Sequence, residues 1–122
     1  MELTLDSATQ RYQIRAYTPG SLFLNTEELR TSVILTPQQL QVWAPEDWAG
    51  LEAGHLSALL DYKFQVLILG TGSTQHFPPA HWLVPFYEAQ LGIEIMSTAA
   101  ACRSFNLLAA EGRQVVAALL IR

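Results

Sequence analysis

The sequence predicts an α/β domain built on a mixed β-sheet. Short apolar alternations fill the first third of the chain, and helical patterns then alternate with apolar strands. That alternation is typical of crossover units, which join parallel neighbours through right-handed connections. The first strands would add antiparallel neighbours. A chain of 122 residues, half of them hydrophobic, suits one domain. We expect residues 11–122 to form it and residues 1–10 to be a loose N-terminal segment.

The first part of the chain predicts strands separated by turns. Apolar and polar residues alternate from Tyr12 to Ala16, as in a strand with one solvent-facing side. Pro37 and Pro45 interrupt the pattern further along, because proline cannot donate to a sheet ladder. The predicted strands are residues 12–16, 22–24, 29–36 and 40–43, with turns at 18–21 and 25–28.

The middle of the chain predicts helix, strand and helix. Residues 54 and 55 open a helix, and the continuous apolar run at 64–69 predicts a buried strand at the centre of the sheet. A second helix is expected at residues 80–91. Pro85 should kink or divide it, because proline removes a helical hydrogen bond.

The last thirty residues carry the clearest pattern. Residues 93–95 alternate and predict a half-exposed strand. A helix follows, capped by Thr98 or Ser97 and ending near Gly112. Residues 115–121 are continuously apolar, which predicts a strand covered on both faces.

Composition excludes several classes of protein. Seven Lys and Arg against eleven Asp and Glu give a net charge of −4, without a basic run, so no nucleic-acid partner is expected. One cysteine and three scattered histidines predict no disulfide, metal site or cofactor. The sequence lacks a secretion signal and a membrane-spanning run, so a cytoplasmic location is expected.

Two stretches are candidates for a ligand or partner site. Gly70, Thr71 and Gly72 follow a buried strand, where ligands of α/β sheets often bind, but neither phosphate-binding glycine motif is complete. A tight strand exit packed under the next helix is the favoured interpretation. Thr98 and Ala99 begin a helix, whose free N–H groups attract anions.

Three more candidates lie on the same helix. Cys102 suits a small buried thiol better than a nucleophile, because no base accompanies it. Arg103 lies early in the helix, where its charge should be offset by an acid such as Glu94 or by a bound anion. A structural ion pair is the favoured interpretation. Asn106 is expected to bind either a backbone segment or a ligand.

Four motifs resemble one widespread, largely uncharacterised family. They are Leu-Gly-Thr-Gly at 69–72, Phe-Pro-Pro at 77–79, Gly-Ile-Glu-Ile-Met at 92–96 and Thr-Ala-Ala-Ala-Cys-Arg-Ser-Phe-Asn-Leu-Leu at 98–108. The family includes the mitochondrial complex I assembly factor three proteins and their short bacterial relatives. The resemblance implies three layers: a mixed central sheet, helices and a small additional N-terminal β layer. It also implies a role in protein assembly by contact instead of catalysis.

Three hypotheses for the function follow. The first is a non-enzymatic protein-interaction or assembly-factor-like module, in a bacterial protein, with an unknown protein partner and no catalytic residue. The alternative is a protein or enzyme that binds a small anionic metabolite between the Gly70–Gly72 loop and the Thr98 helix start. The third is a homodimer formed through exposed apolar strands.

Overall fold

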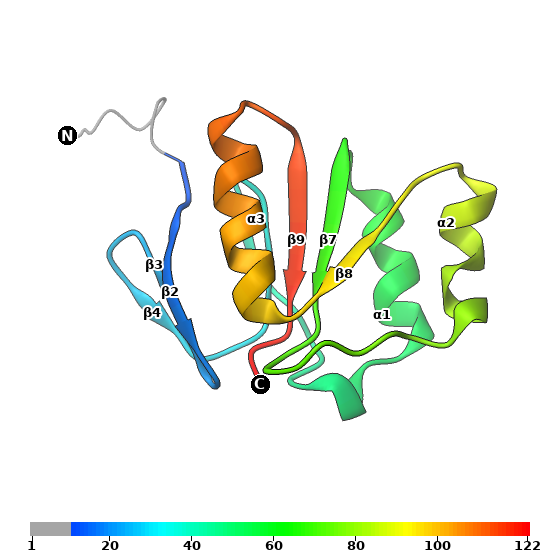
Figure 1. The fold of residues 1–122 in the computed structure, drawn as a ribbon, viewed down its shortest axis with the longest axis horizontal. Coiled ribbons are helices and arrows are strands. Elements are labelled where there is room, and N and C mark those ends of the chain that lie inside the picture. The colour runs from blue at the N-terminus through cyan, green and yellow to red at the C-terminus, as the bar shows by residue number, and fades with distance from the viewer. Residues whose placement is uncertain (1–10) are drawn as a thin grey trace.

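The computed structural model describes residues 11–122 and contains two β-sheets (Figure 1). The predicted loose segment, residues 1–10, lies outside the described residues. The strands are β2 (Ile14–Thr18), β3 (Ser21–Leu24), β4 (Glu28–Leu29), β5 (Val33–Leu35), β6 (Leu40–Val42), β7 (Val66–Gly70), β8 (Glu94–Met96) and β9 (Val115–Leu119). The helices are η1 (Trp48–Gly50), α1 (Ala53–Ser57), η2 (Ala58–Asp61), η3 (Ala80–Leu83), α2 (Val84–Glu88) and α3 (Thr98–Ala110).

The larger sheet is mixed, as the sequence predicts. Its order is β6-β5-β9-β7-β8, and the smaller sheet is β2-β3-β4. β7 runs parallel to both β8 and β9, whereas β5 is antiparallel to β9 and to β6. The central strand is therefore β9. The prediction that residues 64–69 form the central strand is wrong, because β7 lies one position from the centre. Both β7 and β9 are apolar, so only the strand pairing shows which of them is central.

Three layers bury two apolar cores. The small sheet and α3 lie side by side against one face of the large sheet, and α1 and α2 cover the other (Figure 1). β9 supplies both cores: Val115 and Ala117 face α3, and Val116 and Ala118 face the opposite helices. A strand covered on both sides needs apolar residues at every position, which explains its continuous apolar sequence and confirms the predicted fold class.

Residues 29–36 do not form the single strand that the sequence predicts. β4 ends at Leu29 in the small sheet, and β5 begins at Val33 in the large one. Between them Ser32 is buried, and its hydroxyl accepts the N–H of Ile121 at 2.9 Å while donating to the carbonyl of Glu46 at 3.4 Å. These tertiary bonds hold the crossing between sheets, and apolar periodicity contains no sign of them.

Helix ends follow local chemistry. Ser97, not Thr98, caps α3 by accepting the N–H of Ala100. The predicted helix at 80–91 is divided, as the proline predicts, into η3 and α2. Pro85 occupies the first turn of α2, where a missing N–H costs nothing, so the division falls just before it.

Two kinds of feature are missing from residues 11–122. No helix in this range is long and apolar enough to cross a bilayer. No group of three or more His, Cys, Asp or Glu side chains in this range is arranged to hold a metal ion.

Candidate functional site

The candidate loop and helix start do meet at one end of the large sheet. Gly70, the last residue of β7, is in register with Met96 at the end of β8 and with Leu119 at the end of β9. Thr98 then begins α3 beside them, because its N–H donates to the carbonyl of Gly72 at 2.9 Å. The sequence therefore predicted this proximity correctly from the carboxyl ends of parallel strands.

The hydroxyl of Thr98 is fully used inside the protein. It accepts the N–H of Gly72 at 2.8 Å and donates to the carbonyl of Leu120 at 2.8 Å. The side chain is completely buried. Thr98 thus joins the loop after β7 to the end of β9, and it presents no polar atom to a ligand.

Thr71 is also bonded within its own loop. Its hydroxyl donates to the carbonyl of Thr74 at 2.7 Å, lies 3.2 Å from the carbonyl of Met96 and accepts the N–H of His76 at 3.1 Å. The residue is 1% exposed. It therefore shapes the loop instead of facing a cleft.

The two glycines allow the chain to pack against itself. A Cβ on Gly70 would lie 3.0 Å from side-chain atoms of both Leu119 and Thr98. Gly72 has φ +99°, and a Cβ there would overlap the carbonyl of Arg122. The close approach that glycine permits is thus made by the protein's own chain, which confirms the interpretation as a tight strand exit.

Cys102 lies inside the core one turn further along α3. Burial raises the pKa of its thiol to about 12, although the nearby Arg103 charge opposes the shift. A thiol with such a pKa stays protonated near neutral pH and is a poor nucleophile. The interpretation as a small buried thiol is confirmed.

Cys102 is expected to resist alkylation by iodoacetamide in the folded protein, with a pH midpoint near 12. Urea-unfolded protein, the control, should show the midpoint of an ordinary cysteine, about 8.5. Because the folded pKa is raised above 9.0, this residue's contribution to stability is complete below about pH 9 and is lost as pH rises toward 12. Cys102→Ala should remove that part of the alkaline loss. A folded-state midpoint near 8.5 would contradict the assignment.

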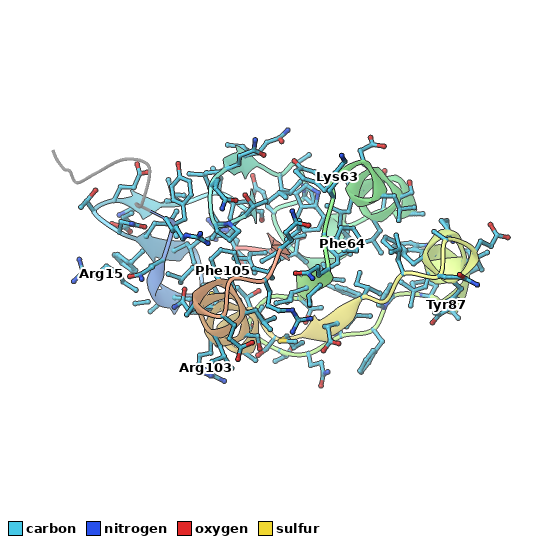
Figure 2. The ribbon with its side chains drawn as sticks, turned by 90° about the horizontal axis from the view of Figure 1, so that it is seen from above. Arg15, Lys63, Phe64, Tyr87, Arg103 and Phe105 are labelled. Atoms are coloured by element: carbon cyan, nitrogen blue, oxygen red, sulfur yellow. The ribbon has the colours of Figure 1, made fainter. Side chains whose placement is uncertain are left out.

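Arg103 lies on the outside of α3, where Figure 2 shows its side chain pointing away from the molecule. Among residues 11–122 the ion pair present joins Arg30 to Glu28, so the predicted pairing of Arg103 with Glu94 is wrong. Solvent screens an exposed charge, and no internal acid is needed to offset it. Ala99, in the first turn, is half-buried.

Asn106 binds the backbone of β2. Its carbonyl oxygen accepts the N–H of Ile14 at 2.9 Å and its amide donates to the carbonyl of Ile14 at 2.7 Å. The two residues lie 92 positions apart in the chain. Of the two predicted roles for Asn106, binding to a backbone segment is therefore the one that the structure shows. This side chain attaches α3 to the small sheet.

The histidines make structural contacts. His55 accepts the N–H of Glu52 through Nδ1 at 2.9 Å and so caps α1. The ring of His76 stacks on Trp48 with 5.1 Å between centroids. The prediction of capping or surface histidines agrees with these contacts.

A charged groove lies at the opposite end of the large sheet. A cavity of about 360 Å³ is bordered by Arg11, Lys63 and Arg113, together with polar residues of the β5–β6 turn and the α3–β9 turn. Sequence reasoning missed it, because these cations lie about fifty positions apart and form no local run. Only the pairing of β7 with β9 brings two of their segments together.

Known proteins match most of the chain. A family model described as a protein of unknown function (DUF498/DUF598) matches residues 14–120. A crystal structure of a Bordetella parapertussis protein superposes with a TM-score of 0.84 at 32% identity, covering 94% of this chain and 99% of that one.

Two named relatives differ in what their names describe. A Francisella tularensis protein named "13 kDa major membrane protein" is 27% identical over 83% of this chain and 84% of its own. The NADH dehydrogenase (ubiquinone) 1 alpha subcomplex assembly factor 3 of Danio rerio is 28% identical over 88% of this chain and 63% of its own. The chain thus spans about three-fifths of that assembly factor.

Proposed function

We propose that the chain, which belongs to the DUF498/DUF598 family of proteins of unknown function, is a non-enzymatic protein-interaction module of the assembly-factor kind. Homology to assembly factors supports this kind of role. The match also confirms the family resemblance carried by the motifs at 69–72 and 98–108. Since this chain covers only about three-fifths of those relatives, their partners and pathway are not transferred.

The observation that carries the proposal is where the protein leaves large apolar side chains exposed. Phe77 is 68% exposed, Tyr87 63% and Val84 41%. Among residues 11–122, three of the five exposed large apolar side chains thus fall between positions 77 and 87, and we name these three residues the 77–87 surface. Tyr87 points away from the molecule on α2 (Figure 2). Aromatic side chains are enriched at protein interfaces, so this surface suits a protein partner.

A second contact is proposed on the outer side of α3. Arg103 and Leu107 lie four residues apart, which places them on the same side of a helix. Leu107 is 62% exposed and Arg103 is exposed. Arginine is also common at interfaces. Of the candidate residues from the sequence, Ala99 and Arg103 remain available to a partner through this side.

The alternative, a small-anion site between the Gly70–Gly72 loop and Thr98, has less support. The hydroxyls of Thr71 and Thr98 are bonded to the protein's own chain. Cys102 is buried, with a raised pKa. These three residues therefore offer a ligand neither an unbonded hydroxyl nor an activated thiol. The interaction module is thus better supported than the small-anion site.

The test is photo-crosslinking and affinity capture with the full chain in cells of its own source. Phe77→Ala/Tyr87→Ala is expected to lower partner recovery about tenfold, because exposed aromatic anchors contribute about 1–2 kcal/mol or more to binding. Arg103→Ala/Leu107→Ala should give a smaller loss. Val42→Ala is the matched control, since Val42 is 67% exposed on the edge strand β6. Equal recovery from all variants, each shown to be folded, would reject the proposal.

A cytoplasmic location and a homodimer stay predictions. Cell fractionation and analytical sedimentation are the measurements that decide them.

A further inference from the structure

We propose that the groove bordered by Arg11, Lys63 and Arg113 binds an acidic polypeptide segment of the partner. This inference rests on the proposed interaction function and adds the chemistry of one contact. We name this cavity, of about 360 Å³, the basic groove.

The charge of the basic groove differs from that of the chain as a whole. The sequence has eleven acidic and seven basic residues, yet three of the seven line this groove, and no Asp or Glu of residues 11–122 lines it. The ion pair among residues 11–122 joins Arg30 to Glu28. No carboxylate of that range is therefore paired with any of the three groove cations.

Hydrogen bonds of the backbone fix the position of the groove. Gln65 and Val66 donate to the carbonyl of Gln114 at 2.8 and 3.2 Å, and the N–H of Gln114 donates to Oε1 of Gln65 at 2.9 Å. The N–H of Arg113 donates to the carbonyl of Leu108 at 3.1 Å. These bonds hold the segment before β7, which carries Lys63, beside the segment before β9, which carries Arg113. The bond of Arg113 also attaches its segment to α3.

The third side of the groove is fixed in the same way. The N–H of Tyr12 donates to the carbonyl of Pro37 at 2.9 Å, which holds the segment with Arg11 against the β5–β6 turn. In that turn the N–H groups of Gln38 and Gln39 donate to the hydroxyl of Thr36 at 3.2 and 2.9 Å. Three separate segments therefore present one cation each around a preformed groove.

An extended acidic segment suits this arrangement better than a compact anion. The three cations are exposed and come from three separate segments. An extended peptide advances about 3.3 Å per residue, so successive carboxylates can meet separate cations. A nucleic acid is less suitable, because the chain carries a net charge of −4.

Asp61 and Glu111 lie two positions from Lys63 and Arg113 in the chain, and neither they nor Glu94 borders the groove. Glu94 lies on the border of a separate cavity of about 210 Å³, between β8 and α3, which Arg113 also borders. No ion pair joins the two among the described residues. Arg113 therefore borders both cavities, and Glu94 borders only the smaller one.

The test uses the full chain and a fluorescent hexaglutamate peptide, followed by fluorescence anisotropy at low salt. Lys63→Gln/Arg113→Gln is expected to raise the Kd of the peptide about tenfold, because each exposed pair contributes about 0.5–1 kcal/mol. The matched control is Arg15→Gln/Arg30→Gln, which changes the net charge equally but leaves all three groove cations in place and should weaken binding less. Salt near 0.5 M should abolish binding, since it screens exposed charges.

Several outcomes would overturn the inference. The first is absence of peptide binding, and the second is an equal loss of affinity in the two double variants. The third is stronger binding of inorganic phosphate, or of a thymidine oligonucleotide with the same charge as the peptide. Failure of the proposed function is a separate result. Partner capture that depends on Phe77 and Tyr87 but not on Lys63 and Arg113 would reject the groove alone. Peptide binding without any captured partner would reject the function.

Discussion

Thr98→Val is expected to lower the free energy of unfolding by about 3–5 kcal/mol. The valine keeps the shape of the side chain but removes a hydroxyl that bonds both the N–H of Gly72 and the carbonyl of Leu120. The site is completely buried, so water cannot replace the lost partner. A buried backbone group left without a partner costs about 1–3 kcal/mol, and here two such groups are affected. Urea unfolding followed by circular dichroism measures the change.

Thr98→Ser provides the control for this prediction. Serine keeps the hydroxyl and loses one methyl group, whose removal should cost only about 1 kcal/mol. The valine variant should therefore unfold at a clearly lower urea concentration than the serine variant. Equal midpoints would show that the two hydrogen bonds contribute little and that the seam between β7, α3 and β9 is held by apolar packing.

Gly72→Ala is expected to cost about 2–4 kcal/mol. An L-residue in the left-handed region costs about 1–2 kcal/mol, and Gly72 has φ +99°. The added Cβ would also overlap the carbonyl of Arg122, so either the loop or the chain after β9 must shift. Thermal unfolding of the purified variant measures the loss.

Gly112→Ala separates the two causes. Gly112 also has a positive φ, +78°, but a Cβ there would meet nothing within 4 Å. It should lose only the conformational part, about 1–2 kcal/mol. If the two alanine variants lose the same stability, the contact with Arg122 has no energetic importance and the structural account of this loop is wrong.

The candidate site shows why a motif can be located correctly while its role stays open. Gly70 and Thr98 were expected to meet because strand ends in a parallel sheet share one edge, and they do. Whether the meeting point faced a ligand depended on Leu120 and Arg122, which lie beyond the motif. Their carbonyl groups complete the seam from the protein itself. No spacing within residues 70–106 encodes that closure.

The sequence by itself determined the elements whose causes are local. The α3 helix has a hydroxyl cap, which the sequence limits to Ser97 or Thr98, alanine-rich turns and a glycine in the left-handed region just past its end, each acting within a few residues. The apolar run of β9 identified a strand buried on both faces, because that burial requires apolar residues at every position.

Only the tertiary structure decided which distant segments pair. The chain crosses from the small sheet to the large sheet at Ser32, whose hydroxyl accepts the N–H of Ile121. Asn106 binds the backbone of Ile14. Three cations from distant segments line the basic groove. A hydrogen bond across 92 positions leaves no periodic signal, since it depends on two residues whose separation in the chain is unrelated to their distance in space. The regions of this protein left free for a partner are therefore readable only after the chain has folded.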